Sequence, residues 1–273
     1  MSAVAIASVL AGFAAAFALV GFGLEFSPSP DRLRRAEASA VGLRAADLFL
    51  FGALLCFMLL FCSAASQLFR RLFADETVST FAYAPAYQLA LLACVFVYKK
   101  FASSHFEFGF FADSFTLKKA AKYFVCMLAC VIAVSLAINA AVFIITGELP
   151  QKQEIIELFK RTQNKFAFAA ALASFTVLAP IVEELLFRGV FYRCVKGVFV
   201  EKLDPQTAAR ASAFLVSALF AALHSNAFAA VPLFVVALFL TSLYERTGSI
   251  VAPILCHSAF NILNVVLIVI TAQ

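Results

Sequence analysis

The sequence predicts an all-α fold: a polytopic transmembrane bundle of about eight spans with short interfacial helices. Three observations carry this prediction. Hydrophobic residues make up 64% of the 273 residues and charged residues only 14%. These are too few charged residues to cover the surface of a water-soluble domain. The apolar residues gather in long runs, and a helix needs roughly 20 of them to cross the hydrocarbon core of a bilayer. Charged residues, Pro or Gly bound each run, as expected for short connections between spans.

The apolar runs are spaced along the whole chain. The first run has no Lys or Arg before it and is longer than the apolar core of a signal peptide, about 7 to 15 residues, so it is predicted to be a retained span. Residues 150–161 predict a short helix lying on the membrane, and 99–122, rich in Phe and Lys, an interfacial stretch at the inner face. The predicted spans are residues 3–26, 47–69, 81–98, 123–146, 166–187, 208–226, 229–245 and 251–270.

The net charge of +5 is best explained by membrane topology. With eight spans, an outside N-terminus places 15 Lys and Arg residues in inner segments and 6 in outer ones, so both termini are predicted to lie outside. No compact basic face is available for nucleic acid, which excludes that class of partner. Four tyrosines near span ends are expected at the headgroup region: Tyr83, Tyr98, Tyr123 and Tyr244.

The fifth run ends in the most informative stretch of the sequence. Glu183 and Glu184 are adjacent carboxylates near the membrane, where an unpaired charge costs several kcal/mol. Arg188 lies one helical turn after Glu184, which favours an ion pair, whereas Glu183 points about 100° away. Pro180 lacks an N–H and therefore leaves a carbonyl at position 175 or 176 without its helical donor. The alternative interpretation is that these charges simply form the wet end of span five.

Two later spans carry the remaining candidates. His224 lies near the far end of span six, where a lone histidine is more often structural than catalytic. His257 and Asn261 are four residues apart in span eight, so their side chains share one helix face. Allowing about 1.5 Å of rise per residue, Glu183, His224, His257 and Asn261 are predicted to converge in the inner half of the bilayer.

Three short motifs thus follow one another: two glutamates with an arginine four residues on, a phenylalanine with a histidine four residues on, and a histidine with an asparagine four residues on. Their residues are Glu183, Glu184, Arg188, Phe220, His224, His257 and Asn261. In this order the motifs resemble the CAAX prenyl protease and bacteriocin-processing family of intramembrane proteases, also known as type II CAAX endopeptidases or abortive-infection-like proteins. The resemblance covers roughly residues 105–270, and residues 1–104 carry spans without motifs, within one compact membrane domain.

The resemblance implies an intramembrane endopeptidase. Glu183 and His224 would activate a water for attack on a peptide carbonyl, and His257 and Asn261 would bind the oxyanion. Glu184 and Arg188 would support the helix that carries Glu183. No cofactor is favoured; the alternative is Zn²⁺ held by Glu183, His224 and His257, although the sequence lacks the helical signature of zinc proteases.

Two other function classes stay open. A proton- or ion-coupled transporter also uses ionisable groups inside the membrane, but it predicts internal repeats, which the sequence does not show. A catalytically silent scaffold or immunity protein would keep the fold without the activity. The expected partners are the lipid bilayer and a peptide or protein substrate, which the resemblance allows to be lipid-modified. The resemblance also implies a bacterial-type plasma membrane.

Overall fold

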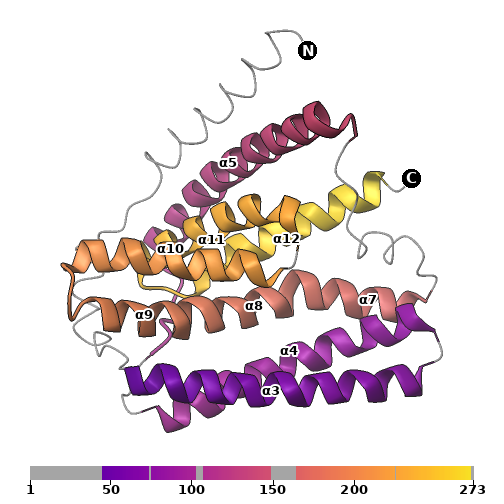
Figure 1. Ribbon diagram of the computed structural model, residues 1–273, viewed down its shortest axis with the longest axis horizontal. Coiled ribbons are helices and arrows are strands. Elements are labelled where there is room, and N and C mark those ends of the chain that lie inside the picture. The colour runs from indigo at the N-terminus through magenta and orange to yellow at the C-terminus, as the bar shows by residue number, and fades with distance from the viewer. Residues whose placement is uncertain (1–44, 74, 103–106, 149–163, 225, 272–273) are drawn as a thin grey trace. The chain divides into compact units, whose positions relative to one another are not determined.

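The protein is all-helical in the part of the chain that the structure describes, residues 45–73, 75–102, 107–148, 164–224 and 226–271. Figure 1 shows this computed structural model. Seven of its helices are long and apolar enough to cross a membrane. They correspond to the last seven predicted spans, which confirms the fold class. The predicted first span, 3–26, and most of the predicted surface helix, 150–161, lie outside the described residues.

The helices group into two units. Unit 1 takes its described residues from Gly109–Gln151 and Lys202–Cys256, and unit 2 takes them from Ser39–Phe108, Lys152–Glu201 and His257–Gln273. The predicted division at residue 104 stays a prediction, since each unit draws on separate segments of the chain.

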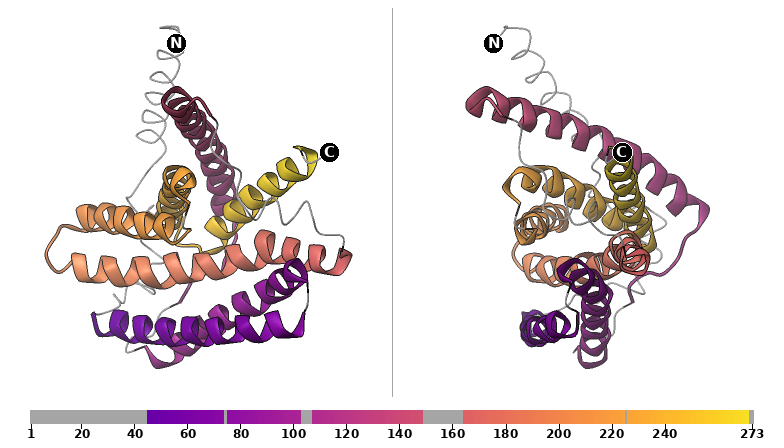
Figure 2. Two further views of the ribbon diagram at one scale, coloured as in Figure 1. Left: turned by 45° about the vertical axis from the view of Figure 1, so that its right-hand side comes forward. Right: turned by 90° about the vertical axis from the view of Figure 1, so that its right-hand side faces the viewer.

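Unit 2 is built around one long helix, Lys165–Phe199. It comprises α7 (Lys165–Ala173), the π-helical segment η1 (Ser174–Leu178), α8 (Ala179–Glu184), the π-helical segment η2 (Leu185–Phe191) and α9 (Tyr192–Phe199). Helices α3 (Ala45–Leu72) and α4 (Glu76–Phe101) form an antiparallel pair, and α4 packs along the long helix from α7 to η2. Both views in Figure 2 show α4 beside it. The part of α12 (Val251–Thr271) from His257 onward completes the unit.

Unit 1 contains α5 (Ser114–Thr146), α10 (Pro205–Leu223), α11 (Ala227–Thr247) and the first turns of α12. Helix α11 packs against both α5 and α10. Tyr123 of α5 and Ser242 of α11 share a hydrogen bond of 3.3 Å. Gly109, at φ +78°, lies so close to the carbonyl oxygen of Gly248 that any side chain at position 109 would collide with it.

Polar residues at helix starts explain where several helices begin. An Asp or Asn side chain accepts a hydrogen bond from a backbone N–H of the first turn, which would otherwise lack a partner. Gly147 and Gly248 end α5 and α11 in the left-handed conformation that glycine adopts without a steric penalty. The capping residues are Asp75, Asp113, Asn164, Asp204 and Asn226.

The cap of α10 predicts a pH-dependent stability. Asp204 accepts hydrogen bonds from the backbone N–H groups of Gln206 and Thr207, at 3.1 and 3.0 Å. The Thr207 side chain and these backbone groups hold the pKa of Asp204 below its usual value. Its stabilising effect is therefore complete above the pKa of the unfolded chain and is lost as the pH falls through the lowered value.

We expect Asp204→Ala to lower the melting temperature in detergent at neutral pH by a few degrees, and the difference from the wild type to shrink on acidification. Melting curves over a pH series measure this. The same change at the exposed Glu201, which caps no helix, is the control. A difference that stays constant down to the most acid pH at which the protein folds would contradict the role of the charge.

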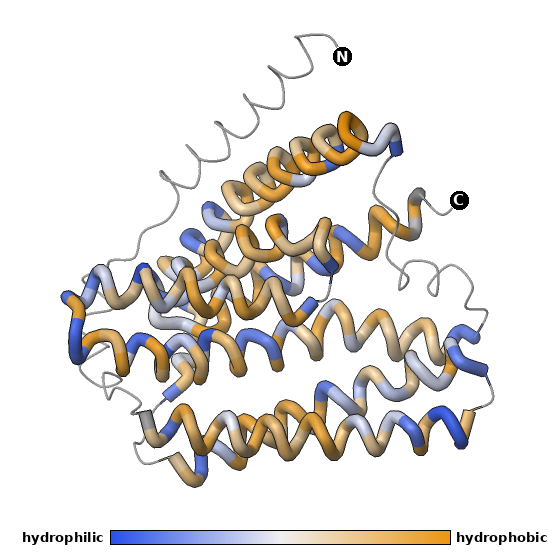
Figure 3. The backbone as a smooth tube through the Cα atoms, in the orientation of Figure 1, coloured by the Kyte–Doolittle hydropathy of each residue, from blue (hydrophilic) through white to orange (hydrophobic). Residues whose placement is uncertain are grey.

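Two helix boundaries differ from the sequence-based prediction at segments that contain charged residues. Helix α5 begins at Ser114 and carries Lys118, Lys119 and Lys122 in its first turns, so the C-terminal part of the predicted interfacial stretch is continuous with the span. The long helix of unit 2 passes through Arg188 to Phe199. Figure 3 shows the hydrophilic segments that interrupt its second half.

Three of the four tyrosines expected at the headgroup region are covered by protein, and their depth in the membrane stays a prediction. Tyr98, Tyr123 and Tyr244 are buried inside their units. The hydroxyl groups of Tyr98 and Tyr123 meet polar atoms of neighbouring helices, Cys194 Sγ at 3.8 Å and Ser242 Oγ. Large apolar side chains instead occupy the outer surface of helices such as α3, where Phe49 and Leu60 are 80% and 72% exposed. Such surfaces suit lipid, so this is an integral, multi-pass membrane protein.

Candidate active site

The two glutamates lie in the middle of the long helix of unit 2. Glu183 and Glu184 are the last residues of α8, eighteen or more residues from the start of the helix at Lys165 and more than a dozen from its end at Phe199. Arg188, in η2, is 1% exposed. The helix continues beyond these charges to Phe199, and the interpretation of them as the wet end of span five stays an alternative prediction.

Pro180 interrupts the backbone hydrogen bonds of the long helix beside the glutamates. In η1 the N–H of Ala179 donates to Ser174, five residues back. Continued by one residue, this pattern would pair Phe175 with the nitrogen of Pro180, which has no hydrogen to donate. The Phe175 carbonyl instead accepts a hydrogen bond of 2.7 Å from Asn261 Nδ2. The predicted free carbonyl is confirmed, and it fixes Asn261 of α12 to the long helix.

This bond predicts a loss of stability when Asn261 is replaced. Asn261→Leu keeps the size of the side chain but removes the donor of this part-buried hydrogen bond, which costs about 0.5 to 1.5 kcal/mol. We expect the free energy of unfolding in mixed micelles to fall by that amount. Leucine at the neighbouring, more exposed Ile262 is the control. Equal stability of Asn261→Leu and the wild type would show that the bond contributes nothing.

Glu184 is held from two sides. Its side chain is fully buried, and Oε1 accepts hydrogen bonds of 2.8 Å from Arg188 Nη1 and of 2.8 Å from His257 Nδ1. The predicted pair with Arg188 is thus present, and the histidine is an additional partner. Buried charges are stable only when paired and hydrogen-bonded, so Glu184 and Arg188 depend on each other.

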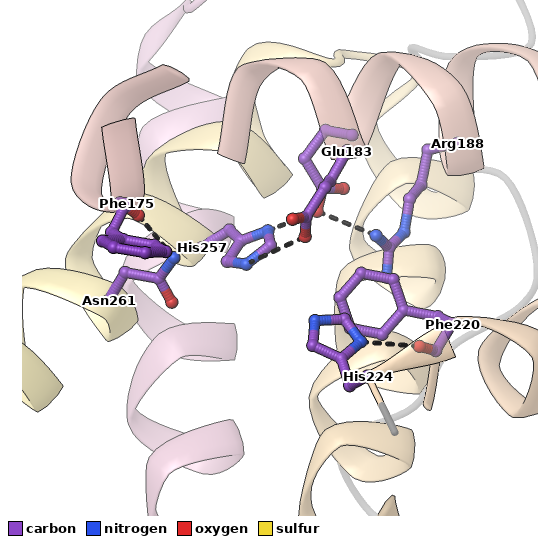
Figure 4. A network of polar contacts seen from close by, with 8 residues as sticks. Phe175, Glu183, Arg188, Phe220, His224, His257 and Asn261 are labelled. Carbon is purple, nitrogen blue, oxygen red and sulfur yellow. Dashed lines mark hydrogen bonds and ion pairs between the residues drawn. The ribbon is translucent and has the colours of Figure 1, made fainter. Parts of the chain in front are cut away.

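His257 connects the two glutamates. A carboxylate only accepts hydrogen bonds, so the Nδ1 atom that meets Glu184 carries the proton. The opposite ring nitrogen, Nε2, lies 3.8 Å from Oε2 of Glu183. Figure 4 shows the imidazole between these groups, with Asn261 one turn further along α12. Glu183 is 23% exposed, in contrast to its buried neighbour, so part of its side chain is not covered by protein.

His224 is fixed by its own helix. It follows the last residue of α10, and its Nδ1 lies 2.7 Å from the Phe220 carbonyl oxygen, also drawn in Figure 4. A carbonyl only accepts, so Nδ1 carries the proton and Nε2 is the nitrogen that remains for chemistry. His224 belongs to unit 1 and the other candidates to unit 2, so their convergence stays a prediction.

One family of known proteins matches this part of the chain. Residues 165–263 match the family model described as Type II CAAX prenyl endopeptidase Rce1-like. The chain carries an Rce1-like segment. All seven motif residues fall within it, and the resemblance found in the sequence is confirmed over this range. No curated protein and no solved structure matches the chain.

The Rce1-like segment offers two histidines with a similar local arrangement. In each, Nδ1 meets a fixed acceptor. Nε2 of His257 faces Glu183 Oε2 at 3.8 Å, and Nε2 of His224 is the nitrogen on the opposite side of its ring. Within the described residues, no three His, Cys, Asp or Glu side chains are grouped closely enough to hold a metal ion. Zinc bound by Glu183, His224 and His257 therefore stays an alternative for experiment.

Sequence reasoning missed one contact of the Rce1-like segment. It paired Glu184 only with Arg188, because their spacing of four residues reports proximity on a helix. The bond from His257 to Glu184 joins residues 73 positions apart. No periodic pattern in a single sequence signals such a contact, and only the packing of α12 against the long helix reveals it.

Proposed function

We propose that this protein is an intramembrane endopeptidase that hydrolyses a peptide bond of a membrane-associated protein or peptide. The observation that carries the proposal is the pair of glutamates bridged by His257. One carboxylate is buried and paired, while the other is partly exposed and oriented by the imidazole. This asymmetry separates a structural carboxylate from one that can exchange protons with water.

In the proposed reaction Glu183 and His224 hold the attacking water. The water oxygen bonds to the peptide carbonyl carbon and its proton passes to the Glu183 carboxylate. The C–N bond of the tetrahedral intermediate then breaks, and that proton goes to the leaving amine. His224 contributes through Nε2, and the proposal requires this nitrogen to reach the same water. Glu184 and Arg188 fix the helix that carries Glu183.

The oxyanion site is proposed to use His257 and Asn261. Asn261 Nδ2 has two hydrogens, and the bond to Phe175 uses one of them. His257 can donate from Nε2 only when the ring carries both protons, a state that its two carboxylate neighbours stabilise once negative charge is also present on the substrate. Each such donor is worth about 10² to 10³ in rate when the site excludes bulk water.

The substrate class follows from the place of the site. A carboxylate in the middle of a spanning helix can act on a peptide that enters from the bilayer or its inner face. The Rce1-like segment supports a substrate carrying a prenylated cysteine near its C-terminus, and a leader peptide without a lipid is the other candidate.

The test is cleavage of quenched fluorescent peptides by the purified full-length protein in lipid nanodiscs. The peptides come as matched pairs, with and without a farnesyl group on a cysteine four residues from the C-terminus. Each is assayed with the wild type, with Glu183→Gln, and with the wild type after treatment with a zinc chelator.

Each outcome separates two functions. Cleavage that needs Glu183 and survives the chelator supports the metal-free peptidase, and loss in the chelator with recovery on added Zn²⁺ supports the zinc alternative. Absence of cleavage by folded protein across the panel would contradict the endopeptidase and favour a silent scaffold. A preference within the matched pairs assigns the substrate class.

A further inference from the structure

Helix α4 brings a tyrosine to the glutamates from outside the segment that matches the family. Phe81, near the start of α4, packs with Ala171 of α7, and Tyr98, near its end, meets Cys194 of α9. The later residue of α4 contacts the later residue of the long helix, so the two helices run in the same direction. Tyr87 lies between these two contacts and therefore beside α8, the segment that ends in the glutamates.

Electrostatics agrees with this placement. The Tyr87 hydroxyl is influenced first by burial, then by Cys62 and by the charge of the Glu183 carboxylate, while the tyrosine itself is only half-buried. Within the described residues no hydrogen bond uses the Tyr87 hydroxyl, so its proton remains available to a ligand. A phenol keeps this proton at neutral pH and can donate it as a hydrogen bond.

The next residue gives a second, independent observation. Gln88 has a buried side-chain oxygen without a hydrogen-bond partner, and so has Glu184, whose Oε2 is buried as well. Two acceptors cannot satisfy each other, and each unpaired one costs about 1 to 3 kcal/mol in a buried place. Helix α4 thus carries a buried acceptor next to Tyr87, and α8 carries another next to Glu183, and each suits a donor such as water or a peptide N–H.

The hydroxyl of the tyrosine one turn earlier in α4 differs from that of Tyr87. Tyr83 has the same side chain one turn earlier, and its ring lies tilted against Tyr87 with centroids 5.9 Å apart. Its hydroxyl donates to the Cys62 carbonyl oxygen at 2.7 Å and so is already used within the helix pair. Of these two neighbouring tyrosines, Tyr87 is the one with a hydroxyl that can serve the reaction.

We propose that the Tyr87 hydroxyl donates a hydrogen bond to the peptide carbonyl oxygen as it becomes negative, beside the water that Glu183 activates. The oxyanion forms on the carbon that this water attacks, so a donor next to Glu183 is within reach of it. Tyr87 would act together with His257 and Asn261, of which Asn261 has already committed one N–H to Phe175. This inference rests on the proposed function and extends it to a catalytic residue.

The test compares two single-atom deletions in the full-length enzyme. Tyr87→Phe is expected to lower kcat by about 10² to 10³ with little change in KM, because the lost bond forms only in the transition state. Tyr83→Phe, one turn away, is expected to leave kcat unchanged. Melting temperatures of both variants in the same nanodiscs report whether either loses folded protein.

A binding measurement makes the result independent of turnover. A peptide phosphonamidate carries a tetrahedral, negatively charged group in place of the reacting carbonyl. Tyr87→Phe should weaken its binding by the same factor as kcat, while the affinity for the uncleaved peptide, measured in the Glu183→Gln background, stays constant.

The outcomes also separate this inference from the proposed function. If Glu183→Gln is inactive while Tyr87→Phe keeps the kcat and phosphonamidate affinity of the wild type, the role of Tyr87 is overturned and the peptidase stands. A rise in KM alone would place Tyr87 in substrate binding and overturn the oxyanion role. If the wild type neither cleaves peptides nor binds the phosphonamidate, both proposals fail together.

Discussion

Glu183→Gln should lower kcat by about 10² to 10⁴ without unfolding the protein, the range that a positioned general base contributes. Glutamine has nearly the shape of glutamate but cannot take a proton from water. The folded state should tolerate the change because the Glu183 side chain is 23% exposed and lies 3.8 Å from His257, beyond hydrogen-bond distance. Steady-state kinetics of a cleaved peptide, together with the melting temperature, measure both expectations.

A matched control keeps this result specific. Glu201→Gln removes the same charge from an exposed turn that follows the long helix and should leave kcat unchanged. If both variants lost the same activity, the effect would come from net charge at the membrane and not from proton transfer. Full activity of Glu183→Gln would remove Glu183 from the reaction and transfer the role of base to another group.

The second large effect concerns stability. Arg188→Leu should lower the free energy of unfolding by about 3 to 5 kcal/mol, because it leaves the buried Glu184 carboxylate without its cation. Adding Glu184→Gln to this variant should restore part of the loss, since glutamine has no charge to neutralise and can still accept from His257. Reversible unfolding in mixed detergent micelles measures the four members of this cycle.

The cycle also defines which result would contradict the prediction. Two interacting groups in contact are expected to show a coupling energy, whereas independent residues add their effects. Additive losses in the double variant would mean that the pair is not coupled. Lys202→Leu, at an exposed position after the long helix, controls for loss of a positive charge and should change the free energy by less than about 0.5 kcal/mol.

Spans two to eight were predictable because burial in lipid imposes a long apolar run, but several helices extend beyond the predicted spans to residues that cap them. Asp75 and Gly248 are examples, because each supplies a bond or a conformation that a helix end requires. The end of the fifth span was not predictable in this way. Arg188 interrupts the apolar run, yet the helix continues through it because Glu184 neutralises its charge inside unit 2.

The candidate site was predictable to the extent that it is local. The Glu184–Arg188 pair and the free carbonyl beside Pro180 both follow from residue spacing on one helix. The bridge from His257 to both glutamates could not be predicted from residue spacing, because it depends on how α12 crosses the long helix. The roles of Glu183, His224, His257 and Asn261 in catalysis stay predictions until activity is measured.

The two π-helical segments determine how the central part of the long helix, α8, is rotated about the helix axis relative to α7 and α9. Each i to i+5 turn holds an additional residue, so it rotates the next part of the helix by about 100° relative to a regular α-helix. The six residues of α8 lie between η1 and η2, and their direction is therefore independent of the apolar stripes of α7 and α9. A residue gained in one segment and lost in the other would turn the carboxylates by about 100° while the faces of α7 and α9 keep their relative direction. The catalytic face of the helix can thus change without any change in the length of the span.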